Sequence, residues 1–224
     1  MFMQDVISMG PFIIKWSWLI LGFSGFVAYL IVKNHLIGIK EEWGKEILDS
    51  VGNSIFLCFV IWKLSLILFE PISVLNNPMV LLYFSGGYRG WILAVIFVFI
   101  YLLLQARKHN IPISSYMQFY GLGFSSAFAI YHLISAFTEK GDLVFHLGEV
   151  LISFIFSGWF YKNHAENQVF QAVIWFGIGQ IFMYFFIDVR VEVWMGLSKE
   201  QLIFLVVTLI GFLGLSKWTN FKET

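Results

Sequence analysis

The sequence is poor in cysteine and in charge, and each shortage excludes a class of protein. Cys58 is the only cysteine among the 224 residues, so the chain can form no intrachain disulfide, cysteine metal site or redox pair. Charged residues make up 12% of the chain, against roughly 25% in an ordinary soluble domain. The formal net charge is zero, so no overall field would attract nucleic acid. An ordinary cytosolic globule is excluded, and no nucleic-acid partner is expected.

The first ten residues also lack lysine and arginine, and Asp5 is their only charged residue. A secretory signal peptide opens with a positively charged region. We therefore expect the first apolar run to be a retained membrane span rather than a cleaved leader.

Hydrophobic residues, in contrast, make up 59% of the chain and aromatic residues 20%. A helix needs roughly 20 apolar residues to cross a hydrocarbon core of about 30 Å, because its backbone groups must find their partners within the helix. The sequence predicts an all-α fold, a polytopic integral membrane bundle of seven transmembrane spans in a single domain, 1–224. The predicted spans are 11–32, 51–70, 88–106, 115–137, 144–161, 167–187 and 201–217.

The distribution of basic residues in the short loops predicts the orientation, because cytoplasmic loops are enriched in lysine and arginine. If the N-terminus is outside, eight of these residues fall inside and four outside; Lys15 and Lys63 are left at membrane depth. We therefore predict that the N-terminus is outside and the C-terminus inside. The longest inner loop, 33–50, alternates charged and apolar residues and is predicted to be a short amphipathic segment at the interface.

Ionisable residues inside a span are costly and usually face the bundle interior or a wet cavity. In the predicted topology, Lys63 lies in the outer half of the second span, seven residues before Glu70 and on the same helical face. His146 and Glu149 open the fifth span from the outside, three residues apart and also on one face. Lys15, Arg89, His132, Gln180 and Tyr184 are further polar residues at membrane depth. Nearly all of these polar groups fall in the outer leaflet. The pattern predicts a polar chamber open to the outer leaflet.

Simpler interpretations of the same residues stay open. Lys15, Glu70 and Arg89 could extend their charged ends to the membrane interface, and Lys63 or Glu149 could form an ion pair that fixes helix register. The spacing of His146 and Glu149 occurs in metal sites, but one pair without further ligands predicts no metal. The sequence Gly22-Phe23-Ser24-Gly25 has the pattern of a rhomboid-type intramembrane protease, although small residues more often allow close helix packing.

Read in order, these features resemble the bacterial prolipoprotein diacylglyceryl transferases, which move diacylglycerol from phosphatidylglycerol to the cysteine of a lipobox. That family also has seven spans, with the N-terminus outside and the C-terminus inside. Lys63 falls where it has an arginine, and Glu149 matches a glutamate that opens its fifth span. The other similar stretches are Gly10-Pro11 followed by Lys15-Trp16, Ser85-Gly86-Gly87 before the third span, and Gly196-Leu197-Ser198 before the last span.

The sequence departs from the family's pattern at several functional positions. Ser17 and Trp18 follow Trp16 where the family has a tyrosine, and Arg89-Gly90 replaces its histidine before a glycine pair. The signature after the fourth span and a sizeable outer insertion are missing. The arginine and glutamate expected on the sixth span fall near Phe182 and Phe186.

The resemblance implies a diverged transferase-like protein of the bacterial plasma membrane. It would bind phosphatidylglycerol in the outer-leaflet chamber and, if active, transfer its diacylglyceryl group to a prolipoprotein signal peptide. No cofactor is expected. The candidate catalytic residues are Arg89, His146 and Glu149, and the candidate lipid-binding residues are Lys15, Lys63, Arg89 and Gln180. The alternative is a non-catalytic accessory subunit that works with a membrane protein partner in lipid modification or export; a transporter subunit ranks third.

Overall fold

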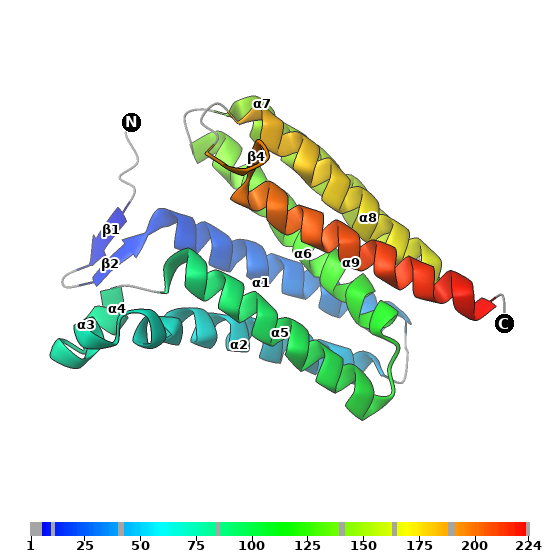
Figure 1. Cartoon of the computed structure of the whole chain (residues 1–224), viewed down its shortest axis with the longest axis horizontal. Coiled ribbons are helices and arrows are strands. Elements are labelled where there is room, and N and C mark those ends of the chain that lie inside the picture. The colour runs from blue at the N-terminus through cyan, green and yellow to red at the C-terminus, as the bar shows by residue number, and fades with distance from the viewer. Residues whose placement is uncertain are drawn as a thin grey trace. The chain divides into compact units, whose positions relative to one another are not determined.

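The computed structural model describes residues 6–9, 12–39, 43–83, 86–138, 142–162, 165–187 and 191–222, and it is largely helical (Figure 1). Seven helices of this described part are long and apolar enough to cross a membrane. The predicted polytopic all-α bundle of seven spans is therefore confirmed. The seven are α1 (Trp16–Ile39), α2 (Gly44–Phe69), α5 (Gly87–His109), α6 (Ile113–Thr138), α7 (Leu143–Lys162), α8 (Glu166–Met183, extended by the 3-10 turn η1, Tyr184–Phe186) and α9 (Lys199–Lys222).

Short elements connect the spans at their ends. The helices α3 (Pro71–Asn76) and α4 (Val80–Tyr83) lie between α2 and α5. Two antiparallel hairpins, which the sequence interpretation did not include, precede α1 and α9. They are β1 (Val6–Met9) with β2 (Phe12–Lys15), and β3 (Glu192–Trp194) with β4 (Leu197–Ser198).

The predicted start of the first span is wrong. Residues 12–15 form β2 instead of the first turn of a helix, and α1 begins at Trp16. Strand β2 pairs with β1 in a register that joins Met9 to Phe12 and Val6 to Lys15. Gly10 and Pro11, which carry part of the family resemblance, lie outside the described residues. A glycine and a proline between two runs rich in β-branched residues are typical of a hairpin, and this local signal prevails over the apolar run.

The predicted interfacial segment 33–50 is also wrong as a separate element. Helix α1 continues to Ile39, and α2 begins at Gly44. The amphipathic pattern is real, because Ile47 is buried while Lys45 is exposed. It belongs to the first turns of α2, where one face packs and the other faces outward.

The described chain packs as two compact units, and each is considered by itself. The described residues within 4–16 and 36–116 form the N-terminal unit, and those within 17–35 and 117–224 form the C-terminal unit. Most of α1 therefore packs with α6 to α9, whereas α2 to α5 form the other unit. That all 224 residues make up a single domain stays a prediction.

In the N-terminal unit, α2 and α5 cross closely at small residues. The Gly86 N–H donates a hydrogen bond to the Trp62 carbonyl over 3.1 Å, and the Ser65 hydroxyl donates to the same carbonyl over 2.8 Å. A Cβ atom on Gly86 or Gly90 would collide with the Ser65 hydroxyl. Close helix approach at small residues is common in membranes, where packing rather than hydrophobicity drives association.

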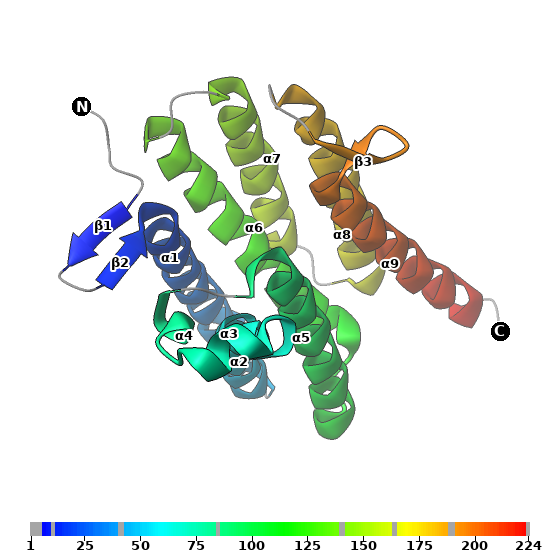
Figure 2. The ribbon, with the colours of Figure 1, turned by 60° about the vertical axis from the view of Figure 1, so that its left-hand side comes forward.

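In the C-terminal unit, α8 and α9 run side by side (Figure 2). Three glycines allow this approach: a Cβ on Gly177 would meet Thr208, one on Gly211 would lie 2.8 Å from Ile174 Cγ1, and one on Gly214 would meet the ring of Phe170. Phe204 of α9 packs against Phe176 of α8 with ring centroids 6.2 Å apart. The same helix pair carries polar residues at one end, next to the start of α7.

Because Gly90 faces Ser65 at the α2–α5 crossing, we predict that Gly90→Ala lowers the free energy of unfolding by about 1–3 kcal/mol, the usual cost of overpacking. The measurement is unfolding by sodium dodecyl sulfate in mixed micelles. Gly52→Ala on α2 is the matched control, because a Cβ there meets nothing within 4 Å. Adding Ser65→Gly should recover part of the loss in Gly90→Ala. Equal stability of the Gly90 and Gly52 variants would contradict this packing.

Candidate functional site

A buried carboxylic acid and a buried amide join α7 to α8. The side chains of Glu149 and Gln180 each have 0% of their surface exposed. Gln180 Nε2 donates a hydrogen bond to Glu149 Oε2 over 2.6 Å. Within the described part of the chain, Glu149 Oε1 and Gln180 Oε1 are buried without a hydrogen-bond partner. An acid at this depth is costly, and the two oxygens leave the pair able to accept further hydrogen bonds.

A pair of histidines joins α6 to α7 at the same end of the C-terminal unit. The Nδ1 atoms of His132 and His146 lie 2.8 Å apart, and the two side chains are 5% and 6% exposed. At that separation one ring must carry its proton on Nδ1 and donate it to the other. The pair therefore fixes opposite tautomers in the two rings, or shares a proton between them.

Aromatic rings surround the histidine pair. The His132 ring packs edge-on against Phe128, with centroids 4.5 Å apart, and against Phe145 at 5.4 Å. Phe145 also packs on Tyr184 of η1 at 5.3 Å. The rings limit access of water to the imidazoles, and they connect the histidines to the end of α8, which carries Gln180.

His132 and Tyr184 were recognised in the sequence as polar groups at membrane depth, but they were not predicted as site residues. A signal for the histidine contact does exist in the sequence. Two antiparallel helices joined by a short loop place residues near that loop opposite each other. His132 lies near the end of α6 and His146 in the first turn of α7. The contact between Glu149 and Gln180 has no such signal, because it depends on the rotation of each helix about its axis.

The N-terminal unit brings the predicted cations Lys63 and Arg89 to one helix crossing. Lys63 follows Trp62 and is half-buried on α2; Arg89 precedes Gly90 and is exposed in the first turn of α5. Trp62 and Gly90 belong to the close α2–α5 contact. The backbones of Lys63 and Arg89 therefore lie next to this contact. Two cations at one crossing could hold a phosphate group.

Lys15 and Gln180 are the other two predicted lipid-binding residues. Lys15 ends β2 instead of lying one turn inside a span, and its side chain is outside the described set. Gln180, predicted to bind lipid, is the hydrogen-bond partner of Glu149. The structure thus groups Glu149 with Gln180 and His146 with His132 in one unit, and Lys63 with Arg89 in the other. Convergence of these groups on one chamber stays a prediction.

The metal and protease interpretations gain no support. No three His, Cys, Asp or Glu side chains gather as metal ligands would in the part of the chain that the structure describes. The Ser24 hydroxyl is fully buried and donates to the Ile20 carbonyl over 2.8 Å. That bond within α1 is the usual one for a serine inside a membrane helix.

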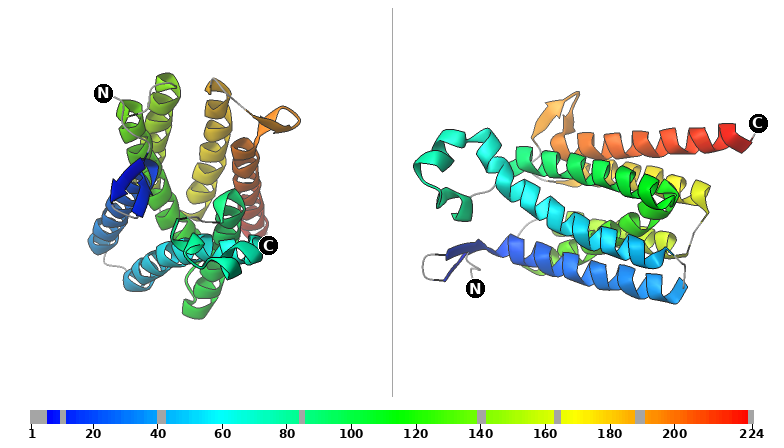
Figure 3. Two further views of the ribbon diagram at one scale, coloured as in Figure 1. Left: turned by 90° about the vertical axis from the view of Figure 1, so that its left-hand side faces the viewer. Right: turned by 90° about the horizontal axis from the view of Figure 1, so that it is seen from below.

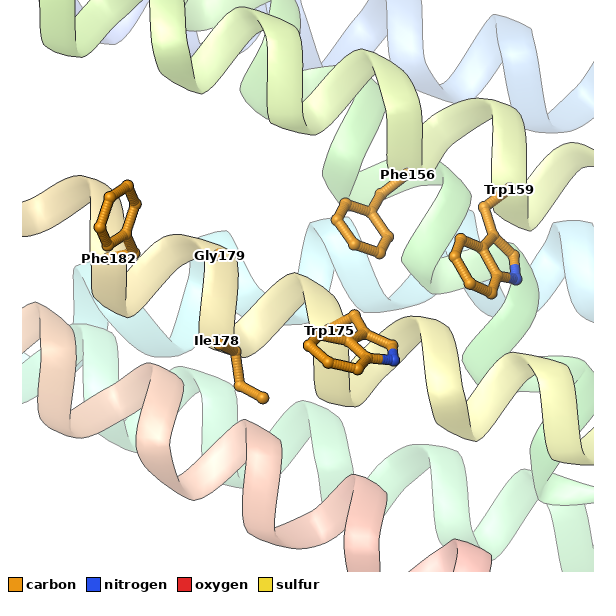
Figure 4. Close-up of a pocket in the computed structure, with 6 residues that line it drawn as sticks. All are labelled: Phe156, Trp159, Trp175, Ile178, Gly179 and Phe182. Carbon is orange, nitrogen blue, oxygen red and sulfur yellow. The ribbon is translucent and has the colours of Figure 1, made fainter.

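An apolar groove of about 500 Å³ is lined by residues of α7 and α8 (Figure 4). Gly179 and Phe182 on its wall flank Gln180 in sequence, and the side chains of Phe156 and Trp159 enter it from α7. Ile152, one turn after Gly148 on α7, packs against Gly179. The remaining lining residues are Trp175 and Ile178.

No family model matches the chain, but three curated proteins are similar to it over almost their whole length. All three are phosphatidylglycerol–prolipoprotein diacylglyceryl transferases of Wolbachia: 23% identical in the strain wRi from Drosophila simulans, 24% in Wolbachia pipientis wMel, and 23% in the strain TRS from Brugia malayi. Each comparison covers 93% of this chain and 92% of the relative.

The alignments run over 250 or 255 positions, more than the 224 residues of this chain. The relatives therefore carry residues with no counterpart here, which agrees with the family insertion found missing in the sequence. The family resemblance is confirmed: the chain is a multi-pass membrane protein and a distant relative of the phosphatidylglycerol–prolipoprotein diacylglyceryl transferases.

Proposed function

We propose that this protein binds phosphatidylglycerol in the outer leaflet of a bacterial plasma membrane and transfers its diacylglyceryl group to the cysteine thiol of a prolipoprotein signal peptide. The observation that carries the proposal is the buried Glu149, which has one carboxyl oxygen without a hydrogen-bond partner among the described residues. The full-length similarity to named transferases supports it.

The order of the chain supports an outer-leaflet site. Consecutive spans alternate in direction, so the end of α2, the start of α5, the end of α6, the start of α7 and the end of α8 all belong to the N-terminal side of the membrane. Lys63, Arg89, His146, Glu149 and Gln180 lie in those parts of their helices. With the N-terminus outside, the basic residues of the loops are in excess inside, as the positive-inside rule requires.

The proposed transfer needs a proton acceptor and a phosphate-binding group. The thiol sulfur loses its proton and forms a bond to the terminal carbon of the diacylglyceryl group. The bond from that carbon to the phosphate oxygen breaks, and glycerol phosphate leaves with the electron pair. Glu149, or His146 held by His132, accepts the thiol proton. Lys63 and Arg89 neutralise the phosphate as its negative charge increases.

The groove between α7 and α8 suits one acyl chain of the lipid. Its lining is apolar and includes Trp159, Trp175 and Phe182. The groove is lined by the same two helices that carry Glu149 and Gln180, so a lipid bound there would lie on the helix pair that holds the proposed proton acceptor. This arrangement supports recognition of a diacyl lipid rather than a water-soluble substrate.

The phosphate-binding role predicts that Lys63→Ala with Arg89→Ala weakens binding of phosphatidylglycerol at least about tenfold, since a hydrogen bond to a charged group contributes roughly 1.5–3 kcal/mol. Native mass spectrometry of the protein in mild detergent, titrated with phosphatidylglycerol, measures this affinity. Lys45→Ala with Arg107→Ala is the matched control, because these residues lie at the opposite ends of α2 and α5. Unchanged affinity in the Lys63 and Arg89 variant would exclude the phosphate site.

The catalytic role predicts that Glu149→Gln lowers transfer about 100-fold or more, because the amide keeps the side chain's shape but cannot accept the thiol proton. The assay follows a labelled diacylglyceryl group from phosphatidylglycerol to a lipobox peptide. Glu166→Gln makes the same chemical change at the start of α8, far along the helix from Gln180, and should leave transfer intact. Transfer by Glu149→Gln at the original rate would remove Glu149 from the mechanism.

A second function, that of a non-catalytic accessory subunit, is favoured by the complete burial of Glu149 and by the missing family signature. A carboxyl with no exposed surface and a hydrogen bond from Gln180 could serve only to hold α7 against α8. In that case the purified protein would retain phosphatidylglycerol without transferring it, and a partner protein would co-purify from mild detergent. Turnover by the protein alone excludes this function.

The orientation is tested by single cysteines in a Cys58→Ser background. Asn76→Cys, exposed at the end of α3, should react with a membrane-impermeant maleimide in intact cells. His109→Cys, exposed at the end of α5, should react only after the cells are permeabilised. The reverse pattern would place the N-terminus inside and move the polar groups to the inner leaflet.

A further inference from the structure

The hairpin formed by β3 and β4 carries an apolar tip away from the helices. It projects sideways from the ends of α8 and α9, across the direction of the helices (Figures 2 and 3). The side chains of Val193, Trp194 and Met195 are 51%, 56% and 81% exposed. Val191, just before β3, is also exposed. Four neighbouring apolar side chains therefore have little cover from the C-terminal unit.

The turn at this tip has an unusual residue. Trp194 pairs with Leu197, so Met195 and Gly196 form a two-residue turn, and their φ angles are 49° and 75°. Such turns favour Asn, Asp or Gly, because both central residues adopt positive φ. Methionine is disfavoured in this conformation, and at its exposure it gains little from packing within the chain. The position thus combines a conformational cost with an exposed apolar side chain.

The base of the hairpin is fixed to both neighbouring helices. Gln201, which is fully buried, accepts a hydrogen bond from the Ser198 N–H over 2.8 Å and donates one to the Ile181 carbonyl over 2.9 Å. Its own N–H donates to the Ser198 hydroxyl over 3.3 Å. These bonds connect β4, α8 and α9, so the tip is held at the level where the two spans end.

We propose that this tip lies in the membrane interface, between the lipid headgroups and the acyl chains, and anchors the α8–α9 pair at that depth. Span α8 ends before the hairpin and span α9 begins directly after it, which places the hairpin at the bilayer surface. Phe182 on α8 and Phe185 and Phe186 in η1 are also exposed near the same ends of the spans. Tryptophan is enriched at this level of membranes, and burial in lipid compensates for the cost of Met195. The proposal depends on the spans and not on transfer chemistry.

The test places a fluorescent label on the tip. Met195→Cys in a Cys58→Ser background is labelled with bimane and reconstituted in vesicles of phosphatidylglycerol and phosphatidylcholine. Quenching by a lipid with a nitroxide near the headgroup end of its acyl chain should exceed quenching by aqueous iodide several-fold. Lys162→Cys, exposed at the charged end of α7, is the control, and its label should be quenched mainly by iodide.

A second labelled position controls for misfolding of the Met195→Cys variant. A label at Val193→Cys on β3 should give the same quenching pattern. Adding Met195→Asn, which suits positive φ but is polar, should preserve or raise thermal stability in detergent and make the Val193 label more accessible to iodide. Quenching of both labels mainly by iodide would overturn the proposal and leave the tip free for a peptide partner. Protection from both quenchers would also overturn it, because protein would then cover the tip.

Discussion

The hydrogen bond from Gln180 to Glu149 lies at a depth where water cannot replace it. Both side chains are fully buried. Separating α7 from α8 would therefore leave a carboxyl and an amide in hydrocarbon, at a cost of roughly 1–3 kcal/mol for each unsatisfied group and more for a charged one. The pair restricts the rotation of both helices, and this restriction sets the positions of His146 and of the adjacent groove.

The close packing elsewhere supports this geometry with residues that have no chemistry of their own. Gly177, Gly211 and Gly214 bring α9 against α8, so α8 is held on one side by glycines and on the other by Glu149. Gly86 and Gly90 likewise let α5 approach α2 closely. They orient the helix turn that carries Arg89. In membranes lipid competes equally for apolar surface, so close contact and hydrogen bonds replace the hydrophobic effect as the source of specificity.

The sequence predicted the seven spans and their order, because the length of an apolar run is set by bilayer thickness. It failed at 12–15 and 33–50, where local propensity decides between strand and helix or between loop and helix. The polar residues of the site were found because charge at membrane depth is rare. Their partners could not be found in the same way: the contact between Glu149 and Gln180 depends on helix rotation, which hydrophobicity leaves undetermined.

One of the departures from the transferase pattern concerns the arginine and glutamate expected on the sixth span, where this chain has apolar residues near Phe182. Two residues before Phe182, α8 carries Gln180, which donates a hydrogen bond to Glu149. A neutral amide supplies a donor and an acceptor without adding a second charge beside the buried acid. The two histidines, whose Nδ1 atoms lie 2.8 Å apart, add a group that can share a proton. The C-terminal unit thus has a buried acid, an amide and two imidazoles in close contact, which are the groups that acid–base chemistry uses.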